Sequence, residues 1–275
     1  MDWTILQFLA PAIVASLVIV GMHAYLGLHV VERGVIFVDL SLAQIASLGA
    51  AMAVWQGYEP QDPAVYWMSL GFTLIGAALF ATVKGQAARI PQEAIIGIAY
   101  AVASAAVILT LSKATGEAEH LRDMLVGNIL SVQWPDVWVT SLVYLAIGIF
   151  HYVFRRRFLD ISIDPASVAA RGVSVRFWDF LFYASFGFVV TRSVAIAGVL
   201  LVFCYLIVPS VGGMLFAERI GARLAIGWVM GVVVSLLGMY FSVQFDLPTG
   251  ATIACTFGLV LAAMAAVRPL LRRSA

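Results

Sequence analysis

Long apolar runs, separated by short polar breaks, occupy most of the chain. Because a helix needs roughly 20 mostly apolar residues to cross a bilayer, each such run is a candidate membrane span. Runs bounded by charge, proline or glycine predict nine spans: Ile5–Gly27, Gly34–Trp55, Ala64–Val83, Ala94–Leu111, Val137–Phe154, Phe177–Val190, Val194–Phe216, Leu224–Phe241 and Gly250–Val267.

The sixth and seventh of these spans are the hardest pair to separate. Phe177–Val190 is short, and Arg192 with Ser193 forms the only break before the next span. Residues 177–216 are nevertheless about twice as long as one crossing requires, so we expect two crossings. The pattern therefore predicts a polytopic helical bundle of about nine transmembrane helices, within a range of about eight to ten.

The composition is that of a membrane protein. Of the 275 residues, 63% are hydrophobic and 11% are charged, and the mean hydropathy is +1.00. Charged residues make up about a quarter of a typical soluble domain. We expect an all-α membrane protein, folded as one transmembrane domain over residues 1–275 and surrounded by the lipid bilayer. The formal net charge of +1 indicates no particular partner, and we expect no binding to nucleic acid.

The basic residues predict an orientation, because Lys and Arg are retained on the cytoplasmic side of a membrane. An N-terminus outside and a cytoplasmic C-terminus leave only Lys113, Arg122 and Arg192 outside. The other basic residues then lie inside; they are Arg33, Lys84, Arg89, Arg155, Arg156, Arg157, Arg171, Arg176, Arg219, Arg223, Arg268, Arg272 and Arg273. This asymmetry favours an odd number of crossings.

Asp39 and Gln44 interrupt the second apolar run, Gly34–Trp55. An ionisable side chain near the centre of a spanning helix costs about 2.5–3.5 kcal/mol on insertion scales, so it usually faces a partner or a pathway. Asp39 therefore marks the first place to look for function.

The loop between the fourth and fifth spans carries Glu119, His120 and Asp123 close together. On a helix these three would lie on one side of about one turn. Oxygen and imidazole ligands together suit borderline divalent metals, so this loop is a candidate collecting site outside the cell. The alternative is an ordinary solvated loop helix.

The loop after the fifth span, from Arg155 to Asp179, predicts a short cytoplasmic helix. Asp164 before Pro165 is a good N-cap with proline at the first helical position, and Gly172 is a natural stop. We expect a short amphipathic helix over Pro165–Arg171, in a region spanning about 160–176 that an ATPase subunit could grip. The alternative is an interfacial helix that steadies the bundle.

Seven short motifs follow one another in register with the hydropathy pattern. They are GLHVVER at Gly27–Arg33, DLSLAQIASLG at Asp39–Gly49, GIAYA at Gly97–Ala101, LVGNIL at Leu125–Leu130, DPASVAARG at Asp164–Gly172, LIVPS at Leu206–Ser210 and DLPTG at Asp246–Gly250. In this succession the chain resembles the permease subunit of ABC importers for zinc, manganese or iron, over nearly its whole length.

The resemblance implies a multi-pass permease of a bacterial inner membrane, homodimeric or paired, with no permanently bound cofactor. It implies a cytoplasmic ATP-binding subunit that docks at the fifth motif, on Asp164, Pro165, Ala169, Arg171 and Gly172. It also implies an extracytoplasmic metal-binding protein that delivers the ion. We expect import by alternating access, with zinc as the first expectation and manganese or iron as alternatives.

The chain departs from the family pattern at the usual metal ligands. Typical members carry an Asp and a His four residues apart in the second helix, and these positions align with Leu40 and Gln44. Asp39 is adjacent, but it lies about 140° around the helix from Gln44, and a Gln carbonyl is a weak ligand for zinc. We therefore expect Asp39 to be the main intramembrane ligand, helped weakly by Gln44.

Three further residues are candidate ligands. His23 and His29 in the first span carry imidazole, the commonest metal ligand, although interhelical hydrogen bonding is the alternative for both. Their spacing places them about 120° apart on a straight helix, so at most one faces a given point unless Gly27 bends the chain. Glu93 matches an acidic family position and is expected near the exit; the alternative is a favourable charge at a helix N-terminus.

Enzymatic motifs are absent from the sequence. There is no G-x-x-x-x-G-K-[ST] phosphate loop, so ATP hydrolysis is expected from a separate subunit, and there is no H-E-x-x-H zinc motif. The other function class is an ion-coupled secondary transporter, which would show inverted repeats and broken helices. No convincing internal repeat is found in the chain.

Overall fold

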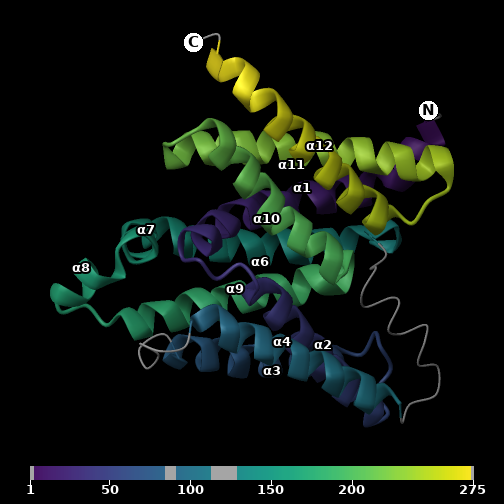
Figure 1. Cartoon of the computed structure of the whole chain (residues 1–275). Helices are drawn as coiled ribbons and strands as arrows, with labels where there is room; N and C mark the ends of the chain where they lie inside the picture. Colours follow the sequence, from purple (N-terminus) through teal and green to yellow (C-terminus); the bar gives the residue numbers. More distant parts are fainter. Residues whose placement is uncertain (1–2, 84–90, 113–128, 274–275) are drawn as a thin grey trace. The chain divides into compact units, whose positions relative to one another are not determined.

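The computed structural model describes residues 3–83, 91–112 and 129–273 (Figure 1). These ranges contain helices and no strand. The long helices are α1 (Trp3–Glu32), α2 (Val38–Trp55), α3 (Pro63–Val83), α4 (Gln92–Leu111), α6 (Trp134–Val153), α9 (Val175–Ala197), α10 (Val199–Phe216), α11 (Ile220–Phe245) and α12 (Thr249–Arg273). Three shorter elements are η1 (Ile129–Ser131), α7 (Arg155–Ile163) and α8 (Pro165–Ala170). Within the described ranges, 9 helices are long and apolar enough to cross a membrane, which confirms the expected number.

The break between the sixth and seventh spans lies elsewhere than we expected. Arg192 and Ser193 are inside α9, and the helix continues to Ala197. The chain turns at Gly198, whose φ of 76° is a conformation that glycine adopts without strain. A single arginine does not end a helix, because its backbone keeps helical geometry and its hydrogen bonds, so the charge was a misleading boundary signal.

Gly27 does not interrupt α1, which runs from Trp3 to Glu32. A Cβ at Gly27 would collide with the backbone carbonyl of Leu206 and with Ser210 on α10. Ser210 Oγ also lies 3.3 Å from the carbonyl oxygen of Ala24. Gly27 is therefore a close-approach position between α1 and α10, the kind of contact that small residues make between membrane helices.

The chain divides into two compact units, each built from separated segments. Unit 1 comprises residues 1–31, 125–146 and 196–275, and unit 2 comprises residues 32–124 and 147–195. In unit 1, α10, α11 and α12 pack on one another. Tyr205 of α10 donates to Ser16 Oγ of α1 at 3.1 Å, and Trp228 of α11 donates to the carbonyl oxygen of Gly21 at 2.9 Å. The expectation of a single domain over residues 1–275 stays a prediction.

In unit 2, α2 lies beside both α3 and α4 (Figure 1). Thr73 of α3 and Thr191 of α9 form a buried hydroxyl pair at 3.0 Å. Gln92 at the start of α4 donates to the Phe80 carbonyl oxygen of α3 at 3.2 Å. The helix that carries Asp39, α2, therefore packs against two helices of the same unit, and hydrogen bonds join one of these, α3, to α4 and to α9.

The segment after α6 contains one helix that we did not predict. We assigned Arg155–Asp179 to a loop with a single short helix, but α7 occupies Arg155–Ile163 ahead of α8. Its buried residues are Phe158, Ile161 and Ser162, which fall on one face at helical spacing. Because three arginines begin this helix, the sequence suggested a solvated loop, and the narrow row of buried residues was not recognised.

Candidate functional site

Asp39 lies in the first turn of α2. Gly34, with a φ of 65°, turns the chain after α1, and the Val38 N–H donates to the Val35 carbonyl oxygen at 3.1 Å as α2 begins. A carboxylate near a helix N-terminus is favoured by the helix dipole. Asp39 is 0% exposed, and neither of its carboxylate oxygens has a hydrogen-bond partner among the described residues. A buried carboxylate in this condition is costly unless a cation or a donor joins it.

Gln44 is also buried, at 6% exposure, on the same uninterrupted helix. Because α2 has no break between the two residues, Asp39 and Gln44 project from different faces, about 140° apart. Leu40, at the position of the usual carboxylate, is a half-buried apolar residue. The face of α2 that runs through Leu40 and Gln44 therefore carries the Gln44 amide and no carboxylate.

Glu93 links the start of α4 to the start of α2. Its Oε1 accepts the backbone N–H of Phe37 at 3.0 Å, and Phe37 is the N-cap residue of α2. This bond joins the start of α4 to the start of α2, two residues before Asp39. The second oxygen, Oε2, has no hydrogen-bond partner among the described residues. Unit 2 therefore brings Asp39 and Glu93 to the same end of α2.

His23 and His29 are both buried in α1, at 0% and 2% exposure. His23 Nδ1 lies 2.9 Å from the Ile19 carbonyl oxygen, and its ring is 6.2 Å from that of Tyr144. The His29 ring meets the Tyr25 ring edge-on at 4.9 Å. Both histidines belong to unit 1, whereas Asp39 and Gln44 belong to unit 2, so the expected ligands are divided between the units.

No group of three or more His, Cys, Asp and Glu residues is arranged to hold a metal ion in the part of the chain that the structure describes. Glu119, His120 and Asp123 lie outside the described residues, so the expected outer collecting site stays a prediction.

The short helix α8 is formed as its sequence predicts. The Asp164 side chain accepts the Ser167 N–H at 3.1 Å, and Pro165 occupies the first helical position. Arg171 is the C-cap residue, and Gly172 ends the helix with a φ of 76°. Ala169 is exposed on this helix. Arg171 Nη2 lies 3.4 Å from Asp160 Oδ2, with the two side chains 56% and 47% exposed.

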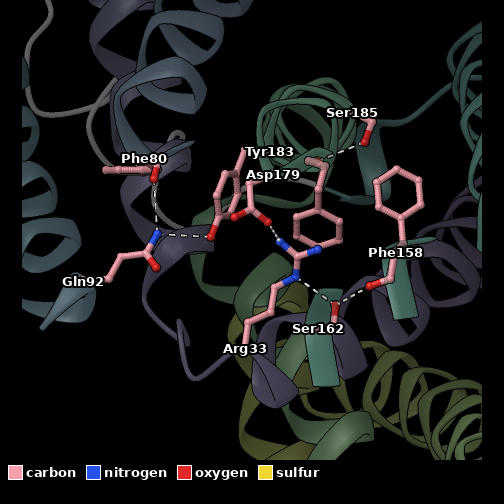
Figure 2. Close-up of polar contacts among 9 residues, drawn as sticks. Arg33, Phe80, Gln92, Phe158, Ser162, Asp179, Tyr183 and Ser185 are labelled. Carbon is pink, nitrogen blue, oxygen red and sulfur yellow. Dashed lines mark hydrogen bonds and ion pairs between the residues drawn. The ribbon is translucent and has the colours of Figure 1, made fainter. Parts of the chain in front are cut away.

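A buried polar cluster that we did not predict lies beside α7, as Figure 2 shows. Arg33 Nη1 lies 2.6 Å from Asp179 Oδ1, with side chains 1% and 0% exposed, and Arg33 Nε donates to Ser162 Oγ at 2.9 Å. The guanidinium also lies over the Phe182 ring at 4.0 Å. The only sequence signals were an acidic residue in the first turns of an apolar span and an arginine at the end of another. Both had been read as loop charges.

The chain matches the profile of the ABC 3 transport family over residues 5–267. A manganese transport system membrane protein, MntC, of Listeria innocua is 25% identical over 89% of this chain and 85% of its own length. A manganese import system permease protein, ScaB, of Streptococcus gordonii is 23% identical over 92% of this chain and 89% of its own.

Two solved structures share the fold. PsaBC from Streptococcus pneumoniae, solved in complex with a Fab, has a TM-score of 0.79 and 24% identity, covering 94% of this chain and 92% of that chain. An inward-facing metal-chelate type ABC transporter has a TM-score of 0.73 and 17% identity, covering 96% of this chain and 89% of that chain. The helices of this chain therefore follow the arrangement of an ABC permease.

Proposed function

Because the chain belongs to the ABC 3 transport family, we propose that it is the membrane permease of an ATP-driven importer that carries a divalent metal ion into the cell. The single observation that carries this proposal at the level of residues is Asp39. Its carboxylate is 0% exposed in a membrane-spanning helix and meets no hydrogen-bond donor among the described residues. Neutralising such a carboxylate is what a cation in transit does.

For the ion we propose manganese in preference to zinc, the first expectation from the sequence. The ligands that α2 offers are a carboxylate at Asp39 and an amide oxygen at Gln44, and oxygen ligands suit manganese better than they suit zinc. The relatives MntC and ScaB are named for manganese transport. His23 and His29 are imidazole groups on α1 that would favour zinc or iron if either one contacted the ion.

We propose three protein partners for this permease. A cytoplasmic ATP-binding subunit grips α8, where Asp164, Pro165, Ala169, Arg171 and Gly172 build a capped and rigid projection. An extracytoplasmic metal-binding protein delivers the ion to the outer face, where Glu119, His120 and Asp123 collect it. A second copy of the chain completes the pathway. If the basic residues orient the chain with its N-terminus outside, α8 lies on the cytoplasmic side of the membrane, where the ATP-binding subunit is expected.

The test is metal accumulation in a strain that lacks this gene, with manganese, zinc and iron measured in parallel. We expect lower manganese content at limiting external manganese, and restoration by the wild-type gene. Uptake that stops on ATP depletion but survives an ionophore that collapses the ion gradients supports an ABC importer. Dependence on the gradient and not on ATP would instead identify an ion-coupled secondary transporter. Unchanged content of all three metals would contradict metal import.

A further inference from the structure

Arg33 contacts three residues on two helices of unit 2, α7 and α9, through one buried side chain (Figure 2). It pairs with Asp179 of α9 at 2.6 Å, donates to Ser162 of α7 at 2.9 Å and lies over the Phe182 ring of α9 at 4.0 Å. A planar guanidinium held by an ion pair, a hydrogen bond and a ring face has little freedom to turn. Arg33 therefore fixes the end of α7 against α9.

The contact with α7 lies directly before the ATPase-binding helix. Ser162 is the last residue but one of α7, and Asp164, two residues later, is the N-cap of α8. Ser162 Oγ accepts from Arg33 and donates to the Phe158 carbonyl oxygen at 2.8 Å, which uses its one proton and one of its lone pairs. A shift of α8 that moves the end of α7 with it would break the bond between Ser162 and Arg33, because the other bond of Ser162 lies within α7.

Along the backbone, Arg33 is followed closely by the start of α2. Arg33 is separated from the first residue of α2, Val38, by the tight turn at Gly34, and Asp39 follows. Glu93 of α4 holds Phe37 in the same connection through the bond of 3.0 Å. The connection is thus held at both ends, by Arg33 on the side of α7 and by Glu93 on the side of α4. A displacement of Arg33 changes how α2 begins.

We propose that Arg33, Asp179 and Ser162 form the joint that carries movement of α8 to the start of α2, and so links ATP hydrolysis by the partner subunit to release of the ion from Asp39. This inference rests on the proposed function. The three are positioning residues, since they touch neither ATP nor the ion. The exposed pair Arg171–Asp160, at 3.4 Å, is a weaker link, because exposed pairs of this kind contribute little to stability.

Ser162 offers the sharpest test, because its replacement leaves the ion pair intact. Ser162→Ala removes the bond from α7 to Arg33 together with the bond within α7 to the Phe158 carbonyl oxygen, whereas Ser162→Thr keeps the hydroxyl. Thr191→Val is the matched control, since it removes an equally buried hydroxyl contact in unit 2 that involves α3 and not α7. Each variant is assembled with its ATPase and delivery protein in proteoliposomes. Uptake of radioactive manganese, ATP hydrolysis and thermal stability are measured together.

We expect Ser162→Ala to retain the ATPase subunit, its hydrolysis and a near wild-type Tm, while manganese imported per ATP falls at least about fivefold, the lower limit of ordinary coupling between sites. Ser162→Thr and Thr191→Val should keep the wild-type ratio. Wild-type import per ATP in Ser162→Ala would overturn the joint. An equal loss in Thr191→Val would overturn it as well, because the effect would then be general.

A second measurement separates the joint from the proposed function. Spin labels at Ala166, exposed on α8, and Ile36, exposed before α2, report whether the two ends move as one body. In the wild-type transporter their distance should stay constant between the nucleotide-free and ATP-trapped states, and in Ser162→Ala it should change. A distance that changes in the wild type overturns the joint. Wild-type proteoliposomes that import no manganese, zinc or iron would overturn the proposed function instead.

Discussion

Arg33 and Asp179 bury two opposite charges, with side chains 1% and 0% exposed. Removing one member of a buried pair is strongly destabilising, by about 3–5 kcal/mol, because it leaves the other charge uncompensated in the interior. We therefore expect Asp179→Leu and Arg33→Met, each alone, to lower the thermal stability of the purified permease by that order. Replacing both residues by apolar side chains should recover most of the loss.

The thermal stability of the four proteins, the wild type, both single variants and the double variant, forms a double-mutant cycle. Recovery in the double variant locates the cost in the unpaired charge. If the stability lost by the double variant equals the sum of the losses in the two single variants, the residues act independently. That result would contradict the ion pair seen at 2.6 Å.

Glu93 either holds the start of α2 through its hydrogen bond to Phe37 or serves as a ligand on the exit path. Replacing it with Gln distinguishes the two roles. Glu93→Gln keeps an oxygen that accepts the Phe37 N–H, whereas Glu93→Ala does not. In the first role, Glu93→Gln should import manganese within about twofold of the wild type, and Glu93→Ala should lose about 0.5–1.5 kcal/mol of stability together with uptake. An equal loss of uptake in both variants, with stability unchanged, would identify the carboxylate charge as the functional feature.

The environment of a residue was predictable from the sequence when it depended on neighbouring positions in the chain. Burial of Asp39 followed from one carboxylate in one apolar run, and the structure confirms it at 0% exposure. The pair Arg33–Asp179 joins residues 146 positions apart, and no spacing rule links them. Each lies at the end of a span, where a charge is usually solvated. Only the packing of α7 against α9 turns these two charges into a buried contact.

Among the elements, α8 is the one whose ends are most fully determined by local signals. Asp164 caps it, Pro165 begins it and Gly172 ends it, all as expected. The break between α9 and α10 and the whole of α7 were missed. A glycine at positive φ, as at Gly198, is indistinguishable in sequence from the other glycines of a membrane helix, which are frequent there.

The residue that ends α8, Gly172, allows a test of where the ATPase subunit docks. Gly172 has a φ of 76° and its N–H donates to the Ala169 carbonyl oxygen at 2.9 Å, so proline can match neither feature. Gly172→Pro should leave the permease inserted but reduce the amount of ATPase subunit that co-purifies and abolish delivery-stimulated hydrolysis. Both are measured on the affinity-purified complex.

Gly57, at the end of α2, provides the matched control. It has a φ of 96° and its N–H donates to the Val54 carbonyl oxygen at the same 2.9 Å, so Gly57→Pro creates a similar backbone defect away from α8. ATPase retention in Gly57→Pro, with loss in Gly172→Pro, supports docking on α8. Retention and normal hydrolysis in both would remove α8 from the ATPase interface.

For the whole molecule, the number of spans and the ABC permease fold were predictable, because apolar length and the order of motifs are properties of the entire chain. The division into two interleaved units was not, since each unit is assembled from segments that are far apart in sequence. For the same reason, whether His23 or His29 serves the ion with Asp39 is a question that hydropathy does not address.

The outer loop gives a prediction about the complete transporter. Replacing Glu119, His120 and Asp123 together by Ala should weaken manganese uptake at low external metal and have less effect when metal is abundant, because a collecting site matters when its ligand is scarce. Initial uptake rates across a range of manganese concentrations test this. An equal proportional loss at all concentrations would indicate damage to folding rather than loss of a collecting site.

The central claim is that Asp39 binds the ion that the permease carries, and its direct test is manganese import by Asp39→Asn in proteoliposomes with the complete transporter. Asn keeps the shape and one oxygen but removes the charge, so import should fall to background while Tm stays near that of the wild type. Ser47→Ala is the control on the same helix, because Ser47 is 5% exposed and its hydroxyl donates to the Ala43 carbonyl oxygen of α2 itself at 3.0 Å. Ser47→Ala should import normally. Normal import of manganese, zinc and iron by Asp39→Asn would contradict the account and leave Asp39 as a contact between helices.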